Sequence, residues 1–203
     1  MSSVVLDRRR LLAAASSLPL MAQAGRPRVG AVTSVRGSAF VRFGGDAPRS
    51  LASLDPLRLD DLVTTGMAAR LECRLLGGIG VHLGERASLW LSRQVVAGLE
   101  TGSFVGVSDG AVMLDVPAGR RSPLSLSLPW GRISTRGGQV WGGPLDGAYA
   151  AYVARGDAEV EAGGRQVTLA EGYGADVAGP GSPPEGVRRW REERIARALG
   201  QSS

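Results

Sequence analysis

The 203-residue sequence has few of the side chains that metal sites and nucleophilic catalysis use, because it contains one cysteine, one histidine and no lysine. A single cysteine, Cys73, excludes an internal disulfide, and together with His82 it excludes a zinc site of cysteine and histidine ligands. A Ser-His-Asp triad would have to use His82, but no G-x-S-x-G motif accompanies it. The glycine pairs match no phosphate-binding loop. We therefore expect no cofactor, and we expect His82 to be a surface histidine.

The excess of one sign of charge is also small. All 24 basic residues are arginine and 19 residues are acidic, so the formal net charge is +5. Residues 1–24 hold three of the arginines and one aspartate, so the remaining chain carries +3. Proteins that bind nucleic acid usually gather their basic residues in one patch or stripe. The sequence therefore predicts no nucleic-acid partner.

Long hydrophobic runs are missing as well. The segment "LDRRRLLAAASSLPLMAQA" (6–24) places three arginines before an apolar run over 11–21 and ends in small residues, which is typical of a secretory signal. The apolar run is about half of the ~20 residues that a spanning helix needs. We predict cleavage after Ala24, a periplasmic protein and no transmembrane helix in the mature chain. Arg8 and Arg9 favour twin-arginine export, and Sec export is the alternative.

From residue 29 to residue 177 the sequence has a pattern that predicts short strands. Apolar and polar residues alternate in runs that glycine interrupts about every ten residues, which is typical of sandwiches, barrels and rolls. In "RLECRLL" the side chains of Leu71, Cys73 and Leu75 share one face, so we expect Cys73 to be buried and structural. The same alternation predicts core residues at Val81, Leu83, Leu89, Leu91, Leu124, Leu126 and Leu128.

The last part of the chain carries a helix pattern. Ser182 precedes two prolines and Glu185, a combination typical of a helix start, and Gly200 would end the helix. The sequence therefore predicts an amphipathic helix over 183–199, with Trp190 on its apolar face as a structural anchor. The predicted segments are a signal peptide over 1–24, an all-β domain over 25–178, and a linker with a C-terminal helix over 179–203.

A tight corner is predicted in "WGRISTRGGQVWGGP" (130–144). Ile133 before the glycine pair and Val140 after it fit the inward positions of two strands, so Gly137 and Gly138 would form the bend. We expect both glycines to be structural.

This register turns four aromatic residues outward, and an arginine lies at the bend. Aromatic rings offer a large contact area at little cost in side-chain entropy, so they could bind a glycan or a protein partner. The alternative is that they lie beneath the predicted C-terminal helix. The candidate binding residues are Trp90, Trp130, Arg136, Trp141 and Tyr152.

Five segments of the sequence form a recognisable pattern through their order and spacing, although each is short and unspecific by itself. They are "GAVTSVRGSA" (30–39), "LRLDDLVTTG" (57–66), "ARLECRLLGGIGVHLGERASLWL" (69–91), "ISTRGG" (133–138) and "AAYVARGDAEVEAGGRQVTLAEGYG" (150–174). This succession resembles the FecR-domain family. Gly66 is the last residue of the second segment. Arg136-Gly137-Gly138 aligns with an element whose sequence in the family is usually Arg-Gly-Thr.

The resemblance implies a periplasmic all-β domain, shaped as a flattened β-solenoid or two-sheet β-roll, that acts in cell-surface signalling with proteins that regulate sigma factors. Relatives that transduce signals carry a cytosolic anti-sigma segment and a membrane helix before this domain. Here the sequence predicts a cleavable signal in that place, so we expect no signalling across a membrane by this chain alone. Gly138 replaces the usual threonine, so the hydrogen bond of that hydroxyl is lost.

Two functions follow from these observations. The first is a non-enzymatic, exported protein that binds an envelope protein or a cell-wall polysaccharide. The alternative is an envelope enzyme acting on carbohydrate, since roll and solenoid folds host such chemistry. Asp60-Asp61 does not supply a catalytic pair, because neighbours on a strand face opposite ways and the segment indicates a turn. A deep groove with two carboxylates would favour the enzyme, and a shallow aromatic patch would favour the binder.

Overall fold

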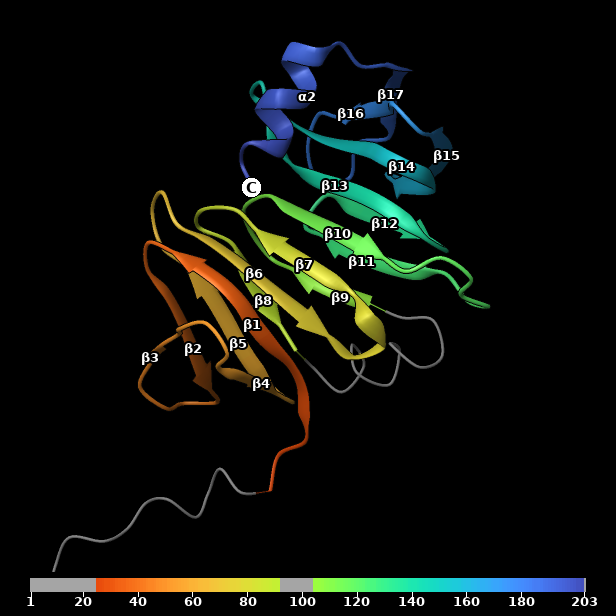
Figure 1. Cartoon of the computed structure of the whole chain (residues 1–203). Coiled ribbons are helices and arrows are strands. Elements are labelled where there is room, and N and C mark those ends of the chain that lie inside the picture. The colour runs from red at the N-terminus through yellow and green to blue at the C-terminus, as the bar shows by residue number, and fades with distance from the viewer. Residues whose placement is uncertain (1–24, 92–103, 203) are drawn as a thin grey trace, which may run out of the picture.

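The computed structural model describes residues 25–91 and 104–202, which form two β-sheets packed face to face (Figure 1). Sheet A has the strand order β4-β1-β6-β7-β10-β13-β14-β16-β17, and each neighbouring pair is antiparallel. Its strands are β1 (Arg28–Arg36), β4 (Pro56–Arg58), β6 (Arg70–Leu75), β7 (Gly80–Leu83), β10 (Val112–Val116), β13 (Gly138–Leu145), β14 (Ala148–Ala162), β16 (Tyr173–Val177) and β17 (Pro184–Arg189). A short 3-10 turn, η1 (Leu76–Gly78), joins β6 to β7.

Sheet B has the order β3-β2-β5-β8-β9-β11-β12-β14-β15 and is antiparallel except between β9 and β11. Its other strands are β2 (Ala39–Phe43), β3 (Arg49–Ser50), β5 (Asp61–Thr65), β8 (Ser88–Trp90), β9 (Phe104–Val107), β11 (Leu124–Leu128), β12 (Gly131–Thr135) and β15 (Arg165–Ala170). In Figure 1 the colour runs from orange at one end of the strand ladder to blue at the other, so the ladder grows along the sequence.

The strand β14 belongs to both sheets. Its residues up to Gly156 pair with β13 and β16 in sheet A, and its residues from Asp157 pair with β12 and β15 in sheet B. The crossing lies at Gly156, which has a φ of 84° and faces Gly138 of β13. The sheets are not closed into a barrel. The predicted all-β roll with a C-terminal helix is therefore confirmed.

The main core lies between the two sheets and contains every core residue that the alternation predicts. Leu71, Cys73 and Leu75 of β6 point inward from sheet A, while Leu124 and Leu126 of β11 point inward from sheet B. Burial of such side chains contributes about 1.5–3 kcal/mol each relative to exposure. Period-2 alternation is a sufficient signal for β6 and β11 because their alternate side chains are at least partly exposed.

A second, smaller hydrophobic cluster covers the outer face of sheet A. It brings together Trp141 of β13, Tyr152 of β14, Trp190 and Ala198, all buried. These side chains point away from the main core, as the register predicts, but the C-terminal segment covers them. The alternative that outward aromatics lie beneath the C-terminal helix is therefore correct for Trp141 and Tyr152.

The predicted helix over 183–199 is wrong in its first half. Residues Pro184–Arg189 form the strand β17 against β16, and the helix α2 spans only Glu192–Leu199. The reason is Gly186, which has a φ of 59°, because glycine weakens a helix interior and this φ is incompatible with one. Trp190 follows the strand directly and is buried, so it anchors the segment as expected.

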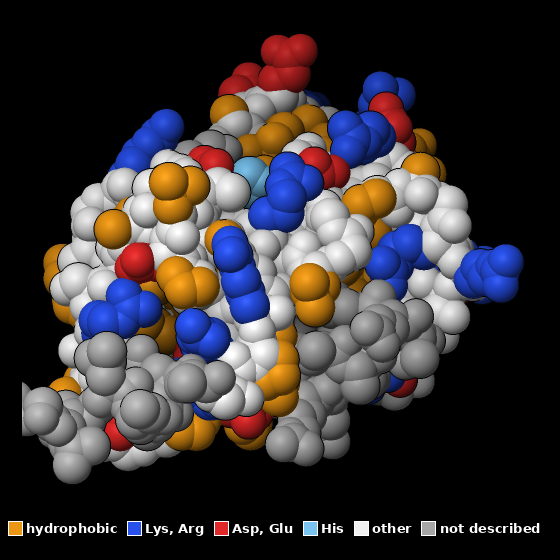
Figure 2. Space-filling model, turned by 60° about the horizontal axis from the view of Figure 1, so that its bottom comes forward, with side chains coloured by type: hydrophobic (Ala, Val, Ile, Leu, Met, Phe, Trp, Pro, Cys, Tyr) orange, Lys and Arg blue, Asp and Glu red, His pale blue; other side chains and the backbone are white. Residues whose placement is uncertain are grey.

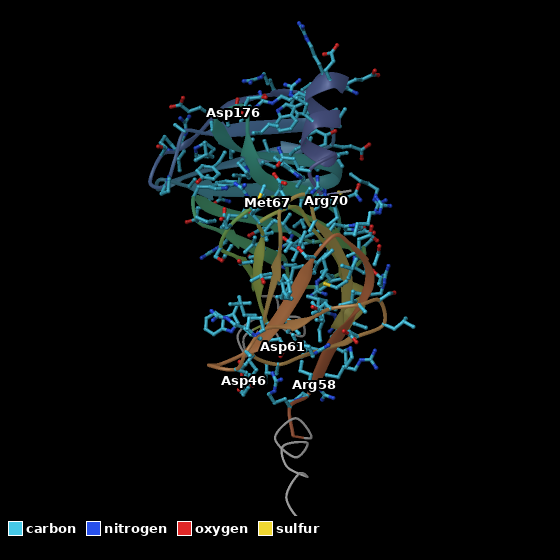
Figure 3. The ribbon with its side chains drawn as sticks, turned by 90° about the vertical axis from the view of Figure 1, so that its left-hand side faces the viewer. Asp46, Arg58, Asp61, Met67, Arg70 and Asp176 are labelled. Atoms are coloured by element: carbon cyan, nitrogen blue, oxygen red, sulfur yellow. The ribbon has the colours of Figure 1, made fainter. Side chains whose placement is uncertain are left out.

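The two ends of the described chain are tied to the fold at different places (Figure 3). The Arg26 guanidinium lies 2.6 Å from the Asp61 carboxylate and 3.9 Å from the centre of the Phe43 ring. Asp61 also accepts the Arg58 backbone N–H at 2.8 Å. At the other end, the Arg70 guanidinium donates to the Gly200 carbonyl at 3.0 Å. Asp61 thus closes a turn, as predicted, and both chain ends are held by arginines.

No helix in the described residues is long and apolar enough to span a membrane. The predicted signal peptide lies outside the described residues. Figure 2 shows a face of the molecule on which arginine side chains stand among acidic and uncharged ones rather than in one block.

Candidate functional site

The four tryptophans lie in different environments, and only one of them is accessible. Trp90 of β8 is 58% exposed, whereas Trp130, Trp141 and Trp190 are 2%, 0% and 5% exposed. The predicted platform of outward aromatics is therefore wrong as a group. Trp90 is the one member whose ring is available to a ligand.

Trp130 was predicted to face outward, but it lies in the main core. Its ring stacks on Tyr149 with ring centres 6.2 Å apart. The reason is that Trp130 precedes β12, which begins at Gly131, so strand alternation does not extend to it. Arg136 is exposed in the turn between β12 and β13 and does not line the hollows around Trp90.

Trp90 stands in the middle of a row of directly paired residues that crosses sheet B on its outer face. Leu62 of β5 is its partner on one side, and Gly106 of β9 is its partner on the other. A Cβ placed on Gly106 would meet no atom within 4 Å. One side of the indole therefore borders open space. The row runs Arg42, Leu62, Trp90, Gly106, Ser127 and Arg132.

A groove of about 510 Å³ follows this row. A second hollow of about 400 Å³ continues it, because both are lined by Ser127, Leu128 and Pro129. The second hollow extends past Arg132, which lies 3.7 Å from the Glu161 carboxylate, to Gly163 and Gly164. Within its described lining the first groove also contains Arg42, Gly44, Asp60, Leu62, Ser88, Trp90, Gly106, Val107 and Ser108.

The described lining of the groove combines one aromatic ring, several hydroxyls and one charge of each sign. Asp60 is the only carboxylate among the described residues that line the groove around Trp90. Paired acid–base hydrolysis of a glycoside needs two carboxylates flanking the bond. Among the described residues, no group of three or more histidine, cysteine or acidic side chains could hold a metal ion.

A third hollow, of about 670 Å³, lies beside the C-terminal segment and is lined by Tyr152, Glu171, Arg189 and Trp190 among others. Burial, with a further contribution from Glu171, raises the pKa of the Tyr152 hydroxyl, although Arg189 opposes the shift. The Tyr152 and Trp190 rings stack at 4.8 Å. The Arg194 guanidinium lies 4.4 Å from the Trp190 ring. Ring faces in this hollow are therefore already used in packing, which makes the Trp90 groove the better candidate.

The glycines predicted to be structural occupy tight positions. Gly138 has a φ of 111°, and a Cβ there would overlap the Arg155 carbonyl of β14. A Cβ on Gly66 would overlap the Ser38 hydroxyl. The Thr135 hydroxyl lies 2.8 Å from the carbonyl oxygens of Gly137 and Asp157. The glycine-rich corner is therefore architectural, because it brings β12 and β13 to the point where β14 changes sheets.

Reasoning from sequence missed most of the groove. Leu62, Gly106 and Ser127 lie on three strands that are far apart in the chain, and only strand pairing brings them together. Alternation predicts that each points away from the core, since Val63, Val107 and Leu126 point inward. It does not predict which strands are neighbours.

Comparison with known proteins supports the fold. No family model matches the chain, and no curated protein matches it significantly. Two crystal structures of candidate anti-sigma factors from Parabacteroides distasonis, at 1.65 and 2.50 Å resolution, are similar, with TM-scores of 0.57 and 0.56. Their identities are 14% and 15%, and each match covers 68% of this chain. It covers 64% and 63% of those chains, so this chain matches less than two thirds of either. The chain thus shares its fold with structures described as candidate anti-sigma factors.

Proposed function

We propose that this protein is a non-enzymatic binding module of the cell envelope that takes its ligand in the groove around Trp90. The ligand is an envelope protein or a cell-wall glycan, and the module acts in cell-surface signalling of the FecR type. The observation that carries the proposal is Trp90, a large aromatic side chain left exposed in a groove while the other three tryptophans are buried. Tryptophan is enriched among the few residues that carry most of the binding energy of an interface.

Two further observations support this function. The similarity to candidate anti-sigma factors is consistent with a regulatory role, and the sequence motifs resemble the FecR domain. The N-terminal segment, with its three arginines and short apolar run, supports export to the periplasm.

A binding role also accounts for the groove better than the alternative of a carbohydrate-active enzyme. The described lining around Trp90 offers one carboxylate, Asp60, and His82 lies on the other sheet, in β7. The His82 imidazole lies 4.0 Å from Glu72, also on sheet A. Neither Asp60 nor His82 has a second acid or base opposite it in the described lining of the Trp90 groove.

The test is capture of envelope material by the purified protein with and without the indole. The wild type and Trp90→Ala are immobilised and incubated with the same envelope extract, and the retained proteins and glycans are quantified. Leu54→Ala is the matched control, because Leu54 is an exposed apolar residue that does not line the groove. We expect the wild type and Leu54→Ala to retain the same material and Trp90→Ala to lose it. Equal retention by all three proteins would refute the proposal.

A further inference from the structure

We infer that the groove around Trp90 binds an uncharged linear polysaccharide, which lies across the strands of sheet B along the row from Arg42 to Arg132. This inference rests on the proposed function and names the ligand class of the same site. Four features of the groove carry it: the open side of Trp90, the hydroxyls, the balanced charges and the length.

The open side of Trp90 fits a flat ring. A sugar presents an apolar C–H face that stacks on an indole, and the polar edge of the same sugar keeps its hydroxyls available. Gly106, the cross-strand partner of Trp90, has no side chain and borders open space. A β-branched residue at this position would occupy the volume beside the indole. The pair of Trp90 with glycine therefore leaves room for one ring beside the tryptophan.

Hydroxyl groups and paired charges surround this ring position. Ser88, Ser108 and Ser127 line the groove, and Ser108 is fixed next to β8 because its backbone N–H donates to the Ser88 carbonyl at 3.0 Å. Arg42 and Asp60 line one end of the groove. Serine hydroxyls, guanidinium groups and carboxylates can all hydrogen-bond to sugar hydroxyls. Each arginine has an acidic residue in the same hollow, so the groove does not favour a charged chain.

The length of the groove favours a polymer. The row from Arg42 on β2 to Arg132 on β12 crosses β5, β8, β9 and β11. With strands ~4.8 Å apart, it extends over roughly 24 Å. The groove and the hollow that continues it share three lining residues, so they form one path. Several rings of an extended chain fit such a path, whereas a single sugar would fill only one part of it.

A protein partner fits the same surface less well. Specific protein interfaces bury about 800 Å² on each partner and have an apolar centre rich in aromatic residues. Trp90 is the single aromatic residue in the described lining of the groove, and the apolar residues there, Leu62, Val107, Leu128 and Pro129, stand among serines, glycines and one charge of each sign. A protein partner is therefore an outcome of the test rather than the ligand inferred.

The test uses the purified protein and a set of defined linear oligosaccharides. The uncharged chains contain two, four or six rings of glucose, mannose, galactose, xylose or N-acetylglucosamine, and hexagalacturonate is the acidic comparison. Affinity is measured by titration calorimetry. We expect at least one uncharged series to bind, with an affinity that rises with the number of rings, and hexagalacturonate to bind at least tenfold more weakly than the best of them.

Variants connect this binding to the groove. Trp90→Ala and Gly106→Val should each weaken binding at least tenfold, the first by removing the indole and the second by filling the space beside it. Gly179→Val and Leu54→Ala are the controls, because a Cβ on Gly179 also meets no atom within 4 Å and neither residue lines the groove. Both controls should bind as the wild type does. Circular dichroism verifies that all four variants are folded.

Three results would overturn the inference. They are no binding of any uncharged chain, stronger binding of the acidic chain, and binding that Trp90→Ala and Gly106→Val leave unchanged. If no oligosaccharide binds but an envelope protein is captured through Trp90, the proposed function stands and only the glycan inference fails. If nothing is captured or bound through Trp90, both fail.

Discussion

Trp90 is exposed and Trp141 is buried, so replacing each with alanine should change the stability of the protein by different amounts. Trp141 is fully buried against Trp190, with ring centres 6.4 Å apart. Removing a buried tryptophan typically costs about 3–5 kcal/mol, so Trp141→Ala should lower the free energy of unfolding by that amount. Trp90→Ala removes an exposed ring from a strand and should cost about 1 kcal/mol or less.

Chemical denaturation of the two variants measures this difference. Trp141→Phe keeps most of the buried area and is the control for ring removal, so its loss should be clearly smaller than that of Trp141→Ala. Similar losses for Trp90→Ala and Trp141→Ala would mean that the Trp90 side chain is packed rather than exposed.

Cys73 should be chemically inert in the folded protein. Burial raises the pKa of its thiol from 9.0 to about 12, so the reactive thiolate is absent at neutral pH. A thiol reagent should label Cys73 only after unfolding, and labelling is followed by mass spectrometry. Cys73→Ser should destabilise the protein by about 1–3 kcal/mol, because it buries a hydroxyl in an apolar core. Rapid labelling of the native protein would contradict the inward register of β6.

The same pKa shift gives a pH dependence. In the unfolded chain the thiol ionises near pH 9, whereas in the folded protein it stays protonated until about pH 12. The folded state binds the extra proton, so stability falls as the pH rises between these values and is unaffected by this group below pH 9. Cys73→Ala should lose this part of the alkaline slope in denaturation curves. An unchanged slope would mean that Cys73 does not contribute to it.

How far the sequence predicts the molecule depends on how local each feature is. The inward positions of Leu71 and Cys73 follow from alternation within one strand, and they are correct. The coverage of Trp141 depends on Trp190, which lies far along the chain, and alternation has no information on such contacts. The groove at Trp90 depends on its pairing with Gly106 across a segment outside the described residues. The core positions within strands were therefore predictable, Trp130 before its strand was not, and the candidate site was predictable only for Trp90.

The C-terminal element, β17 with α2, covers part of the outer face of sheet A, and Trp190 is its main aromatic contact. Trp190 lies so close to Gly174 of β16 that a Cβ on this glycine would overlap the indole. The Arg194 guanidinium pairs with Asp176 of β16 and lies over the Trp190 ring. Ring packing at Trp190 and the Arg194–Asp176 ion pair therefore hold the element in place, together with the ladder between β16 and β17.

Gly174→Ala should displace this cover without changing any residue of it. Overpacking of this kind typically costs about 1–3 kcal/mol, and here we expect a lower melting temperature together with a change in tryptophan fluorescence. Gly179→Ala, where a Cβ has open space, should leave both unchanged. Normal stability and fluorescence in Gly174→Ala would mean that Trp190 does not pack on β16.

The predicted helix over 183–199 is wrong in its first half, and a residue in the sequence explains why. Gly186 stands inside the predicted helix, and a glycine costs about 1 kcal/mol there relative to alanine. The strand ladder with β16 offers backbone hydrogen bonds instead. The serine–proline–glutamate pattern predicts a helix start at Ser182, but the helix begins after Arg191.

At the scale of the whole molecule, the export hypothesis remains a prediction. We expect the exported protein to begin at Gly25, directly before Arg26, whose guanidinium pairs with Asp61. Intact mass of the protein recovered from the periplasm measures the cleavage site. Replacing Arg8 and Arg9 with lysine should abolish export by the twin-arginine route. Unimpaired export of this variant would indicate the Sec route, and a protein that keeps its first 24 residues would contradict cleavage.

The strand β14 also determines how the molecule comes apart. Since its first part is paired within sheet A and its second part within sheet B, neither sheet can lose this strand while the other keeps it intact. Opening of one layer removes a wall of the shared core and exposes the other layer. We therefore expect the two sheets to unfold as one cooperative unit, so that amides on either side of Gly156 exchange with solvent hydrogen through the same global opening, with the same free energy.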